Sequence, residues 1–305
     1  MNEKKLIFFA GLLLSVLILA GNFGVSVEGD TDQLKALVTI PPQSFLVEEI
    51  AGNRFEVNSL VAEDGSPHSA SMTPRKMKTV READIYFRVG TPIGFEVNNL
   101  KVFRQENADM PIQNTSRGIV LKSLGEHYGK PNYGDTRDPG DKAIDNHVWL
   151  SPANLKDMAR NVYDGLKEID PSGKDYYEQN LENLLKKISG IQSEAEKLLE
   201  NFEGRSFLAY HPAWGYFGDE FKLQQVAIQE GGDKPGPKKI QEIAKFAQEH
   251  GIETIIASAQ FSPSTAKMVA GSFGGRVASI NPMEKEILEE IVELAKEISQ
   301  GYSNI

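Results

Sequence analysis

The 305-residue chain contains no cysteine and no basic block. Without cysteine it has no disulfides, thiolate zinc sites, iron–sulfur clusters or cysteine nucleophiles. Its 33 lysines and arginines are outnumbered by 43 acidic residues, which gives a net charge of −10. A nucleic-acid partner is therefore excluded, because such partners are bound through clustered positive charge.

Long apolar runs are also scarce, and the one present lies at the N-terminus. Lys4 and Lys5 precede the uninterrupted run from Leu6 to Gly21. A positive segment followed by an apolar one is typical of an export signal, and the uncharged stretch also has the length of a membrane anchor. Residues 1–27 are thus predicted to be a signal peptide or an N-terminal membrane anchor. Either way, we expect an extracytoplasmic protein, periplasmic or on the outer face of the cell membrane.

The same segment contains "LILAGN", which has the form of a bacterial lipoprotein box with Asn22 at the position of the lipidated cysteine. Asparagine cannot carry that lipid. We therefore expect no lipidation on cysteine.

The body of the chain alternates short apolar runs with helical patterns. Such alternation predicts βαβ units and parallel sheets. The predicted strands are 35–40, 56–61 and 85–90 in the first half, and 206–211, 223–228, 254–258 and 276–280 in the second.

Between these halves, apolar residues recur at helical spacing from Ser172 to about Asn201. A helix of this length spans about 45 Å, at about 1.5 Å per residue. The predicted fold class is therefore α/β, with two lobes that each contain a mostly parallel sheet flanked by helices, joined by one long rigid linker helix. The expected N-terminal lobe covers 35–171, the linker helix 172–201 and the C-terminal lobe 202–305.

Three of the five histidines carry the clearest chemical signal. His68 and His211 lie just past apolar strand-like runs, and His147 lies in "DNHVWLSP". Ligands of open α/β sheets bind beyond the carboxyl ends of the strands, and three imidazoles meeting there suit Zn²⁺ with one position left over. The alternative is that each is an ordinary solvated or hydrogen-bonded loop histidine. The spacing of the three matches no local zinc motif, so spacing alone does not decide between the two interpretations. His127 and His250 are not expected to be ligands.

The segments "EDGSPHSASMTP", "DNHVWLSP" and "LAYHPAWGYFGDEF", in this order, resemble the metal-binding proteins that serve ABC importers of zinc and manganese (the cluster A-I solute-binding proteins). The resemblance extends from about residue 35 to the C-terminus. It implies two lobes that hold one metal ion between them, with His68, His147 and His211 as three of four ligands. Histidine at the third position resembles the zinc-type members, since imidazole suits Zn²⁺ and carboxylate suits Mn²⁺.

The fourth family position falls on Asn281, in "RVASINPMEKE", where the family has a carboxylate. An amide leaves the full +2 charge of the ion uncompensated, which lowers the expected affinity. Water or hydroxide, Asp64, Asp219 or Glu284 are alternative fourth ligands.

Two further residues near these motifs have two readings each. Asp145 either orients the imidazole of His147 or forms a turn, and Trp149 either walls the site or belongs to the core. The loop 125–146 is acidic and has one histidine.

The resemblance implies a binding protein, not an enzyme, that captures Zn²⁺ (alternatively Mn²⁺) and delivers it to an ABC transporter permease. We expect a monomer. A zinc hydrolase is a competing hypothesis, although no HExxH motif occurs, and an adhesin that keeps the fold is another. Because the ligands must be neutral imidazoles, binding is expected to weaken below about pH 6.5.

Overall fold

The computed structural model describes residues 33–124, 143–229, 234–258, 260 and 263–302. The predicted export segment 1–27, His127 and most of the loop 125–146 lie outside the described residues. Within the described part of the chain, no helix has the length and apolarity needed to cross a membrane.

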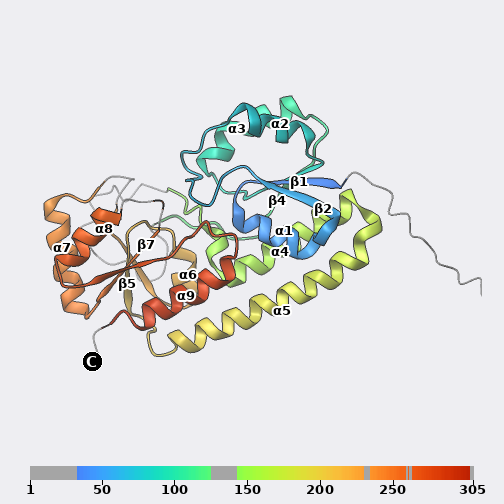
Figure 1. The fold of residues 1–305 in the computed structure, drawn as a ribbon. Coiled ribbons are helices and arrows are strands. Elements are labelled where there is room, and N and C mark those ends of the chain that lie inside the picture. Colours follow the sequence, from blue (N-terminus) through green and yellow to red (C-terminus); the bar gives the residue numbers. More distant parts are fainter. Residues whose placement is uncertain (1–32, 125–142, 230–233, 259, 261–262, 303–305) are drawn as a thin grey trace, which may run out of the picture. The chain divides into compact units, whose positions relative to one another are not determined.

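The first half builds a parallel sheet with the strand order β2-β1-β3-β4 (Figure 1). One layer of helices, α1 and α4, covers one face of this sheet, and α2 and α3 lie on the other. The elements are β1 (Leu34–Val38), α1 (Pro41–Ala51), β2 (Phe55–Ser59), α2 (Pro74–Glu82), β3 (Ile85–Arg88), α3 (Gly94–Glu106), β4 (Ile112–Asn114) and α4 (Pro152–Ile169).

The second half builds a second parallel sheet with the equivalent order β6-β5-β7-β8. β1 and β5, the first strands of the two halves, are interior strands of their sheets, with the next two strands of the chain on opposite sides. The strand order therefore reverses beside β1 and β5. The carboxyl ends at this reversal are the usual ligand position of such sheets. The elements are β5 (Ser206–Ala209), α6 (Gly215–Glu220), β6 (Gln224–Ala227), α7 (Pro237–His250), β7 (Thr254–Ala257), α8 (Pro263–Gly271), β8 (Arg276–Ser279) and α9 (Ile287–Ser299).

The predicted fold class is confirmed, while some element bounds differ from the prediction. The predicted strands run one or two residues past their observed carboxyl ends, because those residues already belong to the loops that follow the strands. β4 was not predicted: it has three residues, and none of them is fully buried. α7 ends as expected, since Gly251 adopts the left-handed conformation at its C-terminus. The predicted N-cap of α8, Ser262, lies outside the described residues.

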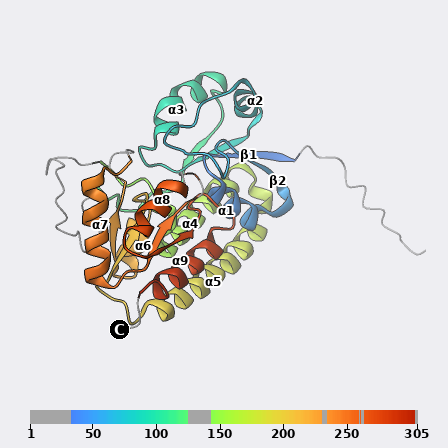
Figure 2. The ribbon, with the colours of Figure 1, turned by 60° about the vertical axis from the view of Figure 1, so that its left-hand side comes forward.

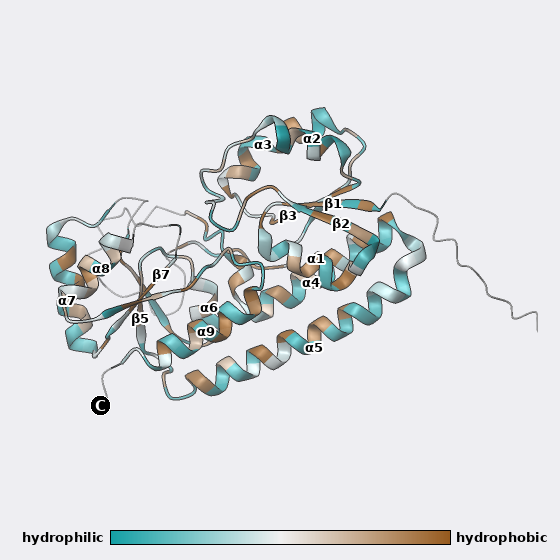
Figure 3. Ribbon diagram, in the orientation of Figure 1, coloured by the Kyte–Doolittle hydropathy of each residue, from teal (hydrophilic) through white to brown (hydrophobic). Residues whose placement is uncertain are grey.

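The long helix α5 (Lys174–Leu199) runs alongside α1 and α4 of the first half and α9 of the second (Figures 1 and 2). Figure 3 shows apolar positions recurring along α5 and α9. The buried stripe of α5 consists of Tyr177, Leu181, Leu184, Ile188, Ala195 and Leu199. One hydrophobic core continues from the first sheet through this stripe to the inner face of the second sheet, whereas α7 and α8 cover a smaller, separate core.

A polar cluster fixes the start of α5. The carboxylate of Asp170 accepts hydrogen bonds from Arg54 Nε (2.7 Å), Tyr177 OH (2.5 Å) and Ser172 Oγ (2.5 Å). Burial alone would raise the pKa of Asp170, but these hydrogen bonds and the charge of Arg54 outweigh it and lower the pKa to about 2. The cluster therefore ties η1 (Gly52–Arg54), which follows α1, to the first turn of α5.

We expect Asp170→Asn to lower the free energy of unfolding by about 2–3 kcal/mol at pH 7, because it weakens three hydrogen bonds to a charged group. The folded-state pKa lies below the ordinary value of 3.8, so the native state binds fewer protons and the contribution is complete above about pH 4. The difference from wild type should shrink as the pH falls to about 2. Urea unfolding at several pH values measures this, and a difference independent of pH would contradict it.

Candidate metal centre

His68 lies in the loop between β2 and α2, and the start of α3 supports this loop. Phe95 N donates a hydrogen bond to Pro67 O (3.0 Å). A Cβ at Gly94 would come within 2.5 Å of the His68 carbonyl oxygen. Only glycine fits this approach without moving the loop, so α3 sets where His68 stands.

His147 precedes the short helix η2 (Val148–Leu150) and is held by Asp145. Asp145 is fully buried, and its Oδ1 accepts hydrogen bonds from both the backbone N (2.9 Å) and the Nδ1 (2.7 Å) of His147. Asp145 thus shapes the turn and orients the imidazole at once. With its proton on Nδ1, the neutral ring presents the lone pair of Nε2.

His211 follows β5, and its Nδ1 lies 3.3 Å from Oε1 of the buried Gln229, which follows β6. An amide oxygen at this place accepts a hydrogen bond from Nδ1–H and again leaves the lone pair on Nε2. Nothing in the sequence pattern identified Gln229, because only the parallel pairing of β5 and β6 brings the two positions together.

The three imidazoles form a triangle. Their ring centroids are 5.2 Å (His68–His147), 5.8 Å (His68–His211) and 5.3 Å (His147–His211) apart. Their ligand nitrogens lie within 4.8 Å of one another, and the Nε2 atoms of His68 and His147 are 3.2 Å apart. Two nitrogens on a tetrahedral Zn²⁺, at about 2.0–2.1 Å each, would be about 3.3 Å apart. The structure therefore brings together the three predicted histidines at a spacing that suits this ion.

No carboxylate of the described residues joins this triangle. Of the alternative fourth ligands, Asp219 forms an ion pair with Lys122 (2.6 Å), and Glu284 accepts a hydrogen bond from Asn281 Nδ2 (3.3 Å). His250 bonds the backbone oxygen of Phe246 in α7.

Asn281 follows β8, and its side chain organises the next turn. Its Oδ1 accepts hydrogen bonds from Met283 N (3.1 Å) and Gln260 Nε2 (3.2 Å). Its backbone N donates to Glu290 Oε2 (2.7 Å). The carbonyl oxygen that would serve a metal thus already accepts two hydrogen bonds.

Burial and mutual repulsion keep two of the histidines neutral. Desolvation, followed by the charge of His147, lowers the pKa of His68 to about 4. As a residue His68 is exposed, but its Nε2 lies 3.2 Å from Nε2 of His147. Desolvation, followed by the charges of His147 and His68, lowers the pKa of His211 to about 3. The expectation that metal binding weakens below about pH 6.5 assumed an ordinary histidine pKa. The pKa values of His68 and His211 lie below that value.

A metal that binds this cluster should therefore displace few protons. Three ordinary imidazoles would release about 2.7 protons at pH 5.5. With His68 and His211 already neutral, we expect at most about one proton per Zn²⁺ at this pH. Calorimetric titrations in buffers of different ionisation enthalpy measure the number, and a value near three would contradict the lowered pKa values.

Trp149 links the segment of His147 directly to the segment of Asn281. The ring is fully buried, and its centroid lies 5.4 Å from that of His147. Its Nε1 donates a hydrogen bond to Pro282 O (2.7 Å). Trp149 therefore belongs to the core and also borders the site.

Glu220 makes a second link between the halves. Glu220, at the end of α6, accepts hydrogen bonds from Ser151 Oγ and Ala153 N (3.2 Å) at the start of α4. Gln192 on α5 donates to its other oxygen (2.9 Å). Because α6 follows His211 and α4 follows His147, this contact fixes the spacing between the two histidine segments.

We expect Trp149→Phe to lower the free energy of unfolding by about 1–3 kcal/mol, because the buried Pro282 oxygen loses its donor. Metal affinity should fall as well, because the Asn281 loop is no longer tied to the His147 segment. Trp214→Phe, in the second lobe, is the matched control for the loss of indole volume. Thermal unfolding and zinc titration of both variants decide the point; equal effects on metal affinity would contradict the linking role.

The fold and the histidine triangle define a two-lobed α/β metal-binding protein. Residues 37–298 match the family model described as ZnuA, zinc-uptake complex component A, periplasmic. The chain therefore belongs to this family, as the resemblance implied.

Individual relatives agree with this assignment. The high-affinity zinc uptake system protein ZnuA of Yersinia pestis is 23% identical over 308 residues, which cover 95% of each chain. A solved structure of ZnuA superimposes with a TM-score of 0.79 at 26% identity, covering 89% of this chain and all of the other. The laminin-binding protein Lmb of Streptococcus agalactiae, described as having adhesin and metal-transporting activity, gives a TM-score of 0.73 at 20% identity over 88% of this chain and 99% of the other. At that identity it shows the fold alone.

Proposed function

We propose that this protein captures Zn²⁺ outside the cytoplasm, between its two lobes, and delivers it to the permease of an ABC importer. The histidine triangle carries the proposal. His68, His147 and His211 supply three neutral nitrogens, and the oxygen of Asn281 or a water molecule supplies the fourth donor. Family membership supports the transport role, and the apolar segment at residues 6–21 supports export.

Zinc is favoured over manganese by the donor set. Three imidazoles and no carboxylate of the described residues make a site of borderline-soft nitrogen donors, whereas Mn²⁺ prefers carboxylate and water oxygens. Asp145, hydrogen-bonded to His147, places one negative charge next to the ligands. The charge of Asp145 thus offsets part of the ion's positive charge, as a carboxylate at position 281 would do.

A hydrolase would need a general base within reach of a zinc-bound water. The carboxylate of Asp145, which adjoins the cluster, already accepts two hydrogen bonds from His147. The site therefore supports binding rather than turnover.

Removal of one ligand tests the site. Zn²⁺ binding should weaken by more than about 100-fold in each of the variants His68→Ala, His147→Ala and His211→Ala. Loss of a residue that only hydrogen-bonds to a ligand costs up to about 100-fold, and loss of a ligand itself should cost more. His250→Ala is the matched control and should leave affinity unchanged. Competition with a chromophoric chelator measures the constants for Zn²⁺ and Mn²⁺. Unchanged affinity in the three variants would refute the site, and tighter binding of Mn²⁺ would refute the choice of metal.

The fourth position has its own test. Asn281→Asp should tighten Zn²⁺ binding, because a carboxylate reduces the net charge of the site. The new carboxylate would also lie close to Glu284, which now accepts a hydrogen bond from Asn281. The double variant with Glu284→Gln removes this repulsion and should bind most tightly, with Glu284→Gln alone as the control. If neither aspartate variant binds more tightly than its control, Asn281 does not face the metal.

A further inference from the structure

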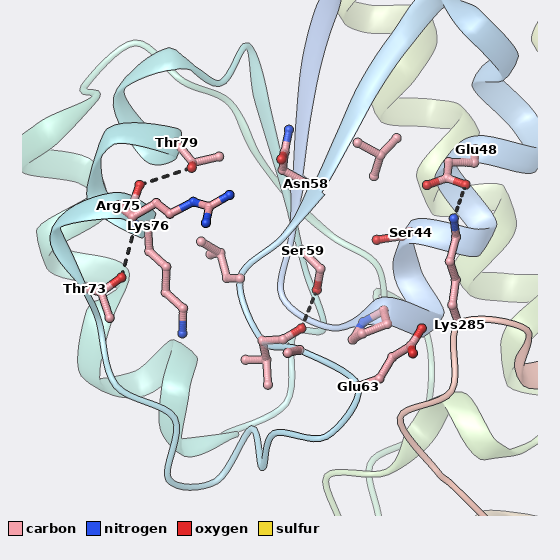
Figure 4. A pocket seen from close by; sticks show the side chains of 15 residues that line it. Ser44, Glu48, Asn58, Ser59, Glu63, Thr73, Arg75, Lys76, Thr79 and Lys285 are labelled. Atoms are coloured by element: carbon pink, nitrogen blue, oxygen red, sulfur yellow. Dashed lines mark hydrogen bonds and ion pairs between the residues drawn. The ribbon is translucent and has the colours of Figure 1, made fainter.

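A cavity of about 550 Å³ lies beside the outer edge of the first sheet. None of the three clustered histidines lines it. Figure 4 shows Thr79 and Arg75 of α2 on one side of the β2 ribbon, and Ser44 and Glu48 of α1 with Lys285 on the other. Lys285 comes from the loop between β8 and α9, so both halves of the molecule contribute to the wall.

The second half of β2 and the loop that follows it form much of this wall. Seven consecutive residues, 57–63, line the cavity, from the second half of β2 into the loop that leads to His68. β2 is the edge strand: its one strand partner among the described residues is β1. An edge strand presents a row of backbone N–H and C=O groups that can pair with another extended chain.

The side chains around this edge favour a negatively charged ligand. Arg75, Lys76 and Lys285 face Glu48 and Glu63, a local excess of one positive charge in a chain with a net charge of −10. Lys285 is paired with Glu48 (2.6 Å), and Lys76 Nζ donates to Ser71 O (3.0 Å). Arg75 forms no ion pair within the described part of the chain, and its guanidinium points toward β2 (Figure 4).

The start of α2 adds to this preference. Thr73 caps the helix by accepting a hydrogen bond from Lys76 N (3.3 Å), so the positive end of the helix dipole adjoins the cavity. A polar groove between an edge strand and a helix is the arrangement in which extended peptides bind by strand addition.

We propose that this cavity binds an extended acidic segment of a partner protein as an additional strand along β2. The five lining residues 57–61, which continue the pairing with β1 to Val61 N→Thr39 O, offer an edge of about 16 Å, at about 3.3 Å per residue, which accommodates four or five residues of the partner. Backbone hydrogen bonds to β2 supply affinity, and acidic side chains facing Arg75 supply selectivity. The proposal does not depend on the metal bound by the histidines.

The probe is a fluorescent hexapeptide of alternating valine and glutamate, compared with the same peptide carrying lysine in place of glutamate. Fluorescence anisotropy with the full chain should show binding of the acidic peptide and none of the basic one. Arg75→Glu should weaken binding by about tenfold or more, because it reverses the charge that faces the ligand. Glutamate near a helix N-terminus is compatible with the helix, and thermal unfolding verifies that the variant folds.

Arg104→Glu is the matched control: it reverses an exposed arginine on α3 that does not line the cavity. Hydrogen exchange should show new protection of backbone amides in residues 56–62 when the acidic peptide is added. The proposal is overturned if the acidic peptide does not bind, if Arg104→Glu weakens binding as much as Arg75→Glu, or if no amide of β2 gains protection. Equal competition by free glutamate would also overturn it, since that result indicates a site for small anions.

Discussion

The packing of α5 against helices of both halves is the constraint on which the metal centre depends. A continuous helix cannot shorten or bend cheaply, so its buried stripe holds α1, α4 and α9 at fixed places along one axis. Each sheet is attached to this frame through those helices, and one core runs from the first sheet to the second. The carboxyl ends of β2 and β5 can then bring histidines from distant parts of the sequence within ligand distance. The cluster at Asp170 matters for the same reason, because it sets where the helix begins.

Three imidazoles converge only because other groups hold them before any metal arrives. Asp145 and Gln229 accept hydrogen bonds from Nδ1–H of His147 and His211, and the start of α3 supports the His68 loop. For His147 and His211 this leaves Nε2 as the ligand atom, and Nε2 of His68 lies 3.2 Å from Nε2 of His147. Burial of the rings is the main cause, and the charge of the neighbouring histidines the second, of the lowered pKa values of His68 and His211. The same crowding that repels protons leaves the nitrogens available for a cation that all three can share.

Much of this arrangement was predictable from the sequence, since strand and helix periodicity is local. The alternation of apolar runs predicted two parallel sheets and a long helix, and the ends of the predicted strands pointed to His68 and His211. β4 escaped prediction because three half-buried residues carry no pattern. Gln229, the Trp149–Pro282 hydrogen bond and the Glu220 contact escaped for another reason. Their partners lie 18 to 133 residues away, and only tertiary packing brings them together.

The amide at position 281 makes physical sense in the surroundings that the structure shows. Its oxygen needs to accept hydrogen bonds from Met283 and Gln260, which asparagine and aspartate both do. Its Nδ2 donates to Glu284, which aspartate cannot do. Glu290 lies nearby, and its oxygen accepts a hydrogen bond from the Asn281 backbone. Burial and, to a smaller extent, the negative charge of Glu284 raise the pKa of Glu290. A third carboxylate there would add repulsion in the metal-free protein. Asparagine thus stabilises this loop in the metal-free protein, and under the proposed function Asp145, hydrogen-bonded to His147, supplies negative charge near the ion.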